Sequence, residues 1–291
     1  MSAPRWDREG RDWPNRVHSR FVDSGGLRWH VQQLGAGPAM LLLHGTGAAT
    51  HSWRTLAPLL AERYAVTAID LPGHGFTTGH PVGGMTMPAV ARAIARLLTR
   101  LELAPHAIVG HSAGAAIAIR KALDGPIAPR AVVGLDAALL PFPGLGGKLF
   151  PTLAKLLFVN PFAPHILSRL VRTRAETARF LERSTGSRID RAGVDQYHRL
   201  FATSAHCAGA IAMMTDWDLE TLTRDLPRLT TPLLLIHGEA DAAIPLSNAR
   251  AAAALIPDAR LTPLAGLGHL AHEERPEEVA RLIHAFIGET A

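Results

Sequence analysis

Residues 108–119 read IVGHSAGAAIAI: an apolar run, one serine between two glycines, and then a run of small residues. Two interpretations of Ser112 are open. In the first, a short strand ends at Gly110 and the Ser112 hydroxyl caps the next helix by accepting a hydrogen bond from a free backbone N–H. In the second, these residues form a G-x-S-x-G nucleophile elbow, a strained strand-to-helix turn that exposes the hydroxyl above a parallel sheet.

The surroundings of the motif decide between the two interpretations, because a G-x-S-x-G match is weak evidence in a chain with 26 glycines. Residues 107–109 are β-prone and follow Pro105, whereas residues 113–123 are small and helix-forming. Strand, turn and helix therefore occur in the order that a nucleophile elbow requires.

Strand-like and helix-like segments alternate along most of the chain, which predicts an α/β fold with a doubly wound, mostly parallel sheet. Residues 17–34 alternate in character around a Ser-Gly-Gly turn and predict an N-terminal antiparallel hairpin. Continuous apolar runs are typical of strands that are buried on both faces. Beyond the hairpin and the elbow, we expect strands at 39–45, 64–70, 131–137, 233–238 and 259–264, and helices around 51–63, 86–102, 246–256 and 276–287.

The alternation stops between residues 140 and 225, where the sequence is helical in character and punctuated by prolines. We therefore expect a helical cap insertion over residues 140–225 and an α/β core formed by residues 1–139 and 226–291. Ligands of such sheets bind beyond the carboxyl ends of the strands. A cap after a core strand is expected to cover that position.

The composition excludes several classes of protein. The single cysteine, Cys207, rules out a disulfide within the chain and a multi-cysteine zinc site. The formal charge is +5, but the basic residues are scattered without interleaved aromatic side chains, so nucleic-acid binding is not expected. The charged first residues contain no signal peptide, and no apolar run is long enough to span a bilayer. The expectation is a cytoplasmic protein without a metal or organic cofactor.

A serine hydroxyl attacks only when a base takes its proton and a carboxylate orients that base. The chain order in elbow-containing folds is serine, acid, histidine. Asp241 follows the expected strand LLLIHG, and His269 lies in a glycine-rich loop after the last expected strand. Asp136, which follows the strand AVVGLDA, is the alternative acid, and His272 is the alternative base.

Two backbone donors are needed for the oxyanion of the tetrahedral intermediate, since losing one costs about 10²- to 10³-fold in rate. Ala113 supplies the first, directly after the nucleophile. The second comes from the loop HGTGAATHSW, residues 44–53, through Thr46 or alternatively Gly47. His44 is expected to stabilise this loop, and core packing is the alternative role for Trp53 and His111. The candidate pocket residues are His44, Gly45, Gly47, Trp53 and His111.

Five segments together resemble the α/β-hydrolase family over nearly the whole chain apart from the cap: HGTG, DLPGHGFT, GHSAG, HGEADAAIP and GLGHLAHEERPEEV. The resemblance implies an esterase-like serine hydrolase that forms an acyl-enzyme at Ser112. Serine at the elbow, instead of aspartate, argues against the family's haloalkane dehalogenases and epoxide hydrolases. A cofactor-free haloperoxidase-type activity uses the same residues and stays an alternative.

The first 80 residues, with Trp6 and Trp13 in a polar leader, resemble the magnesium chelatase accessory family of bacteriochlorophyll biosynthesis. This resemblance implies porphyrin metabolism, a porphyrin intermediate as the small-molecule substrate, and contact with magnesium chelatase. A non-catalytic porphyrin-binding or chelatase-assisting protein is the alternative. Residues 141–215 carry ten Lys/Arg against four acidic side chains, which suits a porphyrin carboxylate but equally a solvated helix face. The apolar segment 149–167 could also touch a membrane surface.

Overall fold

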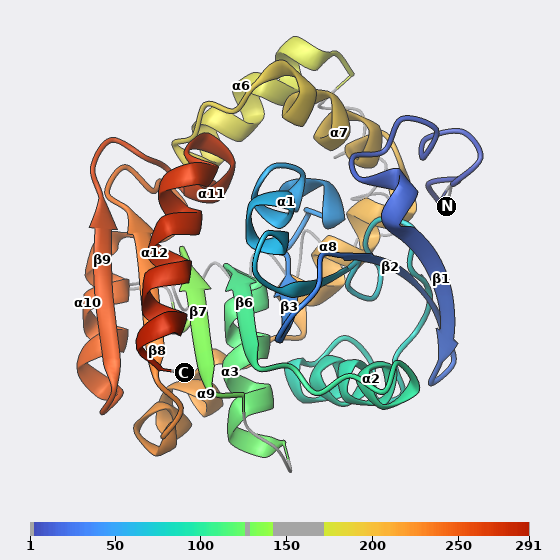
Figure 1. Ribbon diagram of the computed structural model, residues 1–291. Coiled ribbons are helices and arrows are strands. Elements are labelled where there is room, and N and C mark those ends of the chain that lie inside the picture. Colours follow the sequence, from blue (N-terminus) through green and yellow to red (C-terminus); the bar gives the residue numbers. More distant parts are fainter. Residues whose placement is uncertain (1–2, 126–128, 142–171, 291) are drawn as a thin grey trace.

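The computed structural model describes residues 3–125, 129–141 and 172–290, and in these residues a single sheet lies between layers of helices (Figure 1). The strand order is β1-β2-β4-β3-β6-β7-β8-β9, with β5 paired to β2. The strands are β1 (Ser19–Ser24), β2 (Leu27–Leu34), β3 (Ala39–Leu43), β4 (Ala65–Ile69), β5 (Thr78–Gly79), β6 (Ala107–His111), β7 (Ala131–Leu135), β8 (Leu233–Gly238) and β9 (Ala259–Leu264).

The pairing of the strands confirms the expected hairpin and the mostly parallel sheet. β1 pairs with β2, and β2 with β4, in antiparallel orientation. From β4 through β3, β6, β7 and β8 to β9, every neighbouring pair is parallel. The short β5 was not expected from the sequence, because two residues are too few to show an alternating pattern.

The middle of the sheet is buried on both faces, and β3 shows how. Leu41 and Leu43 belong to one hydrophobic cluster, whereas Met40 and Leu42 belong to the cluster on the opposite face. Successive side chains of a strand point to opposite faces. A strand that is buried on both faces therefore needs an apolar residue at every position. This explains the continuous apolar run at residues 40–43.

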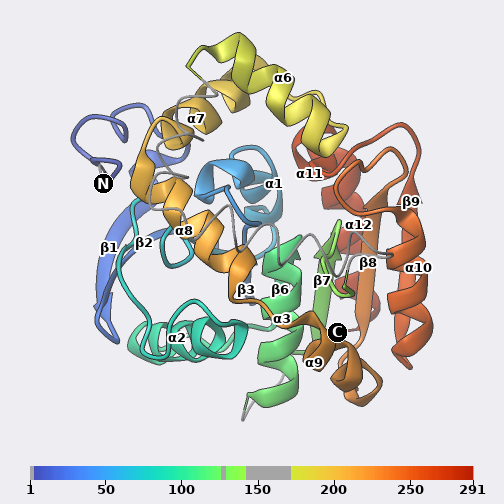
Figure 2. The same cartoon turned by 180° about the vertical axis from the view of Figure 1, so that it is seen from behind.

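Helices cover both faces of the sheet (Figures 1 and 2). α2 and α3 contribute to the cluster that contains Leu41, and α1 and α12 to the cluster that contains Met40. None of the described helices is both long and apolar enough for a membrane span. The helices outside the region 174–225 are α1 (Leu56–Ala61), α2 (Met87–Arg100), α3 (Ala113–Asp124), α10 (Leu246–Leu255), α11 (Ala271–Glu274) and α12 (Pro276–Glu289), with 3-10 turns η1 (Arg16–His18), η2 (Thr50–Trp53) and η3 (Leu226–Arg228).

The helix expected at residues 51–63 is instead divided into η2 and α1. Pro58 explains the division, because proline has no N–H and would break a hydrogen bond inside a longer helix. In α1, Pro58 lies in the first turn, where its N–H would have no partner in the helix anyway. The expectation of one continuous helix was therefore wrong.

Four helices follow in the second half of the expected cap: α6 (Arg174–Thr185), α7 (Arg191–Phe201), α8 (Ser204–Thr215) and α9 (Leu219–Asp225). In both views, α6 and α7 lie beyond the carboxyl ends of β6 and β7. The remainder of the expected cap, residues 142–171, lies outside the described residues. The division of the chain into core and cap stays a prediction.

The polar leader packs against the core through its tryptophans. Trp13 is 2% exposed and donates from Nε1 to Thr50 Oγ1 across 3.0 Å. Trp6 and Trp13 both make edge contacts with Phe76. Arg199 of α7 forms an ion pair with Asp12, so the leader also contacts the helices beyond the sheet.

Candidate active site

Ser112 lies in a strained turn between β6 and α3, with φ 50° and ψ −114°. It occupies the N-cap position of α3, but its side chain makes no capping hydrogen bond. The helix-capping interpretation of this serine is therefore wrong. A Cβ atom at Gly110 would overlap Ala115 N, and one at Gly114 would overlap Leu43 O. Both glycines are required by the crowding around the turn, whose backbone conformation costs about 1–3 kcal/mol.

The loop after β3 passes so near the serine that Gly45 has no room for a side chain. A Cβ atom at Gly45 would lie 3.1 Å from Ser112 Cβ and 2.7 Å from His111 Nδ1. His44 is fully buried, donates from Nδ1 to Gly45 O across 2.8 Å and accepts at Nε2 from Leu71 N across 2.9 Å. Because the C=O and N–H of a trans peptide point in opposite directions, His44 also sets the direction of the Thr46 N–H.

Backbone donors are available beside Ser112. Within the described ranges, the N–H groups of Thr46, Gly47 and Ala113 donate to no other protein group. Ala113 is the first residue of α3, so its N–H has no partner within the helix. The Thr46 hydroxyl is directed to Met213 Sδ of α8, 3.3 Å away. Thr46 would therefore donate to an oxyanion through its backbone N–H and not through its side chain.

Asp241 and His269 form a hydrogen-bonded pair at the ends of β8 and β9. His269 Nδ1 donates to Asp241 Oδ2 across 2.7 Å. The other carboxyl oxygen, Oδ1, accepts from Ala243 N at 2.7 Å and Ile244 N at 2.9 Å. Each of the two residues is 8% exposed. The Nδ1 proton of His269 is engaged by Asp241, and within the described residues no hydrogen bond is made at Nε2, the nitrogen that would accept a proton.

Asp136, the alternative acid, lies nearby in a different environment. Its Oδ1 accepts from Gly238 N across 2.7 Å, and within the described ranges it makes no hydrogen bond with His269. Burial and the negative charge of Asp241 raise the pKa of Asp136 well above its usual value. The structure thus places Asp241, and not Asp136, against His269.

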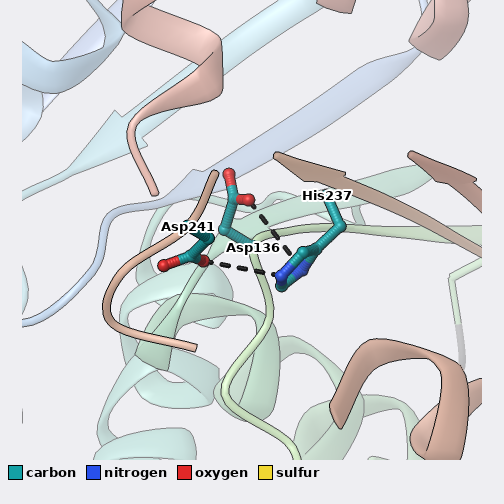
Figure 3. Close-up of side chains that lie close together, drawn as sticks. All are labelled: Asp136, His237 and Asp241. Carbon is teal, nitrogen blue, oxygen red and sulfur yellow. Dashed lines mark ion pairs between the residues drawn. The ribbon is translucent and has the colours of Figure 1, made fainter. Parts of the chain in front are cut away.

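His237 of β8 lies beside both carboxyl groups (Figure 3). Its Nδ1 is 3.8 Å from Asp136 Oδ1, and its Nε2 is 3.6 Å from Asp241 Oδ2. Potential ligand atoms of these three buried residues lie within 4.8 Å of one another, as a metal site would require. Nε2 donates to Ile244 O across 2.9 Å, however, and both oxygens of Asp241 accept hydrogen bonds. His237 Nε2 and both oxygens of Asp241 are therefore already engaged by other protein groups.

The histidines around His269 have structural partners. His272, the alternative base, is hydrogen bonded through Nε2 to Ser52 Oγ across 2.8 Å, and burial lowers its pKa to about 3. His111 donates from Nε2 to His269 O across 2.8 Å. Trp53 has no exposed surface and packs in the same cluster as Leu42. Of its two alternative roles, pocket lining and core packing, the structure supports core packing.

The helices beyond the sheet pack on the loops that carry these groups. Leu181 of α6 and Tyr197 of α7 form a cluster with Ala48, which lies in the first loop, and with Leu270, which follows His269. Glu274, Thr185 and Ser187 hold the backbone around His269 and were not singled out from the sequence. Nothing in the local sequence reveals a contact between segments more than 80 residues apart, such as the 2.9 Å hydrogen bond from Ser187 to Glu274.

Comparisons with known proteins identify relatives of this chain. Residues 40–282 match the profile of the "Alpha/beta hydrolase family". The chain is 39% identical to the magnesium-chelatase 30 kDa subunit of Rhodobacter capsulatus, over 94% of this chain and 95% of that protein. It is 28% identical to 2-(acetamidomethylene)succinate hydrolase of Mesorhizobium japonicum, over 92% and 95% of the two chains.

A similar fold occurs in a putative lipase from Acinetobacter baumannii, with a TM-score of 0.80 and 20% identity over 100% of this chain and 98% of the other. At this identity, the likeness concerns the fold alone. The profile match covers most of the chain and includes β3, the elbow and the loops after β8 and β9. The protein therefore belongs to the alpha/beta hydrolase family.

Proposed function

We propose that the protein is a serine hydrolase that acts on an ester or a related acyl compound. The observation that carries this proposal is the 2.7 Å hydrogen bond from His269 to Asp241. The backbone O of the same His269 accepts from His111, the residue before Ser112 in the strained elbow. A buried carboxylate that holds a histidine in one tautomer supports its role as a general base.

In the proposed reaction, Ser112 Oγ attacks the acyl carbon while its proton passes to His269 Nε2. The N–H groups of Ala113 and of Thr46 or Gly47 donate to the resulting oxyanion. The C–O bond to the leaving alcohol then breaks, and the alcohol takes the proton from His269. Water, deprotonated by the same histidine, hydrolyses the acyl-enzyme and regenerates Ser112.

The biological setting we propose is porphyrin and bacteriochlorophyll metabolism in the cytoplasm, in contact with magnesium chelatase. The 39% identity to the magnesium-chelatase 30 kDa subunit supports this setting. Arg179 and Arg183 of α6 are exposed, and arginine pairs well with carboxylates such as those of a porphyrin. A porphyrin intermediate is therefore the substrate class to test first.

The same identity favours a second candidate, a porphyrin-binding or chelatase-assisting protein that does not use its serine. This candidate keeps the same biological setting but predicts that substitution of Ser112 has no consequence in the cell. It therefore differs from the first candidate in one measurable respect.

Both candidates are tested with purified wild type beside Ser112→Ala, using a fluorophosphonate probe, simple p-nitrophenyl esters and porphyrin intermediates. We expect wild type to be labelled and Ser112→Ala to be unlabelled, with ester hydrolysis reduced at least about 10³-fold. Ser184→Ala, which replaces an exposed serine of α6, serves as the matched control and is expected to behave as wild type. A folded wild type that neither labels nor hydrolyses any ester would contradict the first candidate.

Complementation of a deletion strain separates the candidates in the cell. Restoration of pigment synthesis by wild type but not by Ser112→Ala is expected for the hydrolase. Full restoration by Ser112→Ala would favour the non-catalytic candidate.

A further inference from the structure

The backbone around His269 is held from outside its own loop. Three consecutive N–H groups donate to distant acceptors: Gly268 N to Glu274 Oε2 at 2.9 Å, His269 N to Thr185 O at 2.8 Å, and Leu270 N to Ser187 Oγ at 2.8 Å. Thr185 and Ser187 belong to the end of α6 and its connection to α7. The acceptors for these N–H groups of the His269 loop therefore come from this connection and from the carboxyl group of Glu274.

Glu274 joins these two parts into one unit. In addition to Gly268 N, its Oε2 accepts from the Ser187 hydroxyl at 2.9 Å, and its Oε1 accepts from Arg188 N at 2.9 Å. All three partners are donors, which matches a carboxylate, an acceptor-only group. A carboxylate shared in this way holds the His269 loop and the α6–α7 connection in a fixed relation.

The connection also reaches the loop of the candidate acid. Thr185 O, which accepts from His269 N, accepts from Ala242 N at 3.3 Å as well. A Cβ atom at Gly268 would lie 2.5 Å from both Gly186 C and Ser187 N, and one at Gly186 would overlap Ala240 O. Backbones packed this closely leave no room for either loop to shift alone.

We propose that Glu274 and Ser187 are positioning residues, which orient His269 toward Asp241 and Ser112 by joining its loop to the α6–α7 connection. The proposal rests on the hydrolase function proposed above. In this proposal, residues 185–188 support the loop that carries the candidate base. The sequence alone predicts only that these residues form part of a cap over the site. Neither side chain is placed in contact with substrate, so their effect passes through His269.

The first test is Glu274→Gln, which keeps the shape of the side chain but turns an amide NH₂ toward one of the donors that the carboxylate accepts. Misplacement of a catalytic group by about 1 Å can cost about 10²-fold in rate. We expect kcat for ester hydrolysis to fall 10- to 100-fold with KM nearly unchanged. Glu278→Gln is the matched control, since Glu278 of α12 forms an ion pair with the exposed Arg275 across 3.3 Å, and it should retain wild-type kcat.

Ser187→Ala provides a second variant that removes two hydrogen bonds without introducing a donor. We expect the same direction of change, with kcat reduced about 5- to 20-fold and the far-UV circular dichroism unchanged. If Glu274→Gln does not fold, Ser187→Ala decides the matter. If Glu274→Gln and Ser187→Ala are both folded and each keeps a kcat within twofold of wild type, the proposal is overturned.

A spectroscopic measurement separates this proposal from the hydrolase function itself. The Nδ1 proton of His269, shared with Asp241, is recorded by ¹H NMR and assigned by its loss in His269→Gln. We expect the signal in wild type and Glu278→Gln, and its loss or displacement in Glu274→Gln and Ser187→Ala. If wild type lacks activity on every ester but the signal still depends on Glu274, the positioning stands and the hydrolase function fails; an unchanged signal in both variants overturns the positioning.

Discussion

His269 Nδ1 and Asp241 Oδ2 lie 2.7 Å apart, although the two residues are 28 positions apart in the chain. The residues meet because β8 and β9 are parallel neighbours, so the loops at their carboxyl ends leave the sheet side by side. Two backbone donors hold Asp241 Oδ1 on the opposite side of the carboxyl group.

Asparagine substitutions distinguish the two candidate acids. Asp241→Asn is expected to lower kcat about 10³- to 10⁴-fold, because the amide no longer holds His269 in the reactive tautomer. Asp136→Asn should stay within about threefold of wild type, since burial raises the pKa of Asp136 and an amide resembles its neutral acid. Steady-state ester hydrolysis measures both, and a larger loss in Asp136→Asn would contradict this assignment.

Gly45 is expected to tolerate no side chain. In Gly45→Ala, the new methyl group would lie 2.7 Å from His111 Nδ1 and 3.1 Å from Ser112 Cβ, so the first loop must move away from the serine. We expect kcat to fall at least tenfold. Gly288→Ala in α12 is the control, because nothing lies within 4 Å of a Cβ atom there, and it should keep wild-type kcat and gain about 0.5–1 kcal/mol in stability. Equal activity of the two variants would refute the predicted displacement.

Acid should destabilise the fold through buried histidines. Burial lowers the pKa of His206 to about 4 and of His272 to about 3, whereas an unfolded histidine titrates near pH 6.5. Their contribution to stability is therefore present above about pH 6.5 and is lost as the pH falls toward the folded pKa values. Each histidine contributes a slope of up to about 1.4 kcal/mol per pH unit.

Urea unfolding of His272→Gln between pH 7 and pH 5 tests this slope. We expect the free energy of unfolding of the variant to depend less on pH than that of wild type, by roughly one proton. His80→Gln removes an exposed histidine and should leave the slope unchanged. Identical slopes in wild type and His272→Gln would show that His272 does not contribute.

The leader should contribute to folding through Trp13. Because this side chain is 2% exposed, Trp13→Ala is expected to cost about 3–5 kcal/mol in urea unfolding. Trp13→Phe keeps most of the packing and loses the hydrogen bond to Thr50, at a cost of about 1 kcal/mol for that bond. Val17→Ala, at a side chain 90% exposed, is the control. A Trp13→Ala protein as stable as this control would indicate that the leader does not support the fold.

Local sequence patterns predicted an element correctly where the pattern is long and fits only one type of secondary structure. The apolar runs of β3, β6 and β8 and the amphipathic α2 were placed within a few residues of their bounds. Elements of only two to four residues, such as β5 and α11, were not predicted, because they contain about one repeat of the strand or helix period, too little to show a pattern. The break before α1 was missed, although Pro58 signals it.

The candidate site, too, could be predicted only in part from the sequence. Ser112, Asp241 and His269 could be singled out from the sequence because the chain order and the strand ends restrict where each residue type can stand. The choice between Asp241 and Asp136 needed the tertiary structure, since both follow core strands. Only atomic distances distinguish the carboxyl group that accepts from His269.

The amino-acid sequence was enough to predict the chain order of the longer core strands and helices, the elbow, and the two loops in which an acid and a base could lie, because these depend on short-range periodicity and glycine placement. The tertiary structure alone decided that Ser112 does not cap α3. It also decided that Thr185 O accepts from both Ala242 N and His269 N. Contacts of this kind join segments more than 50 residues apart, and their energies depend on packing in three dimensions, which no local pattern records.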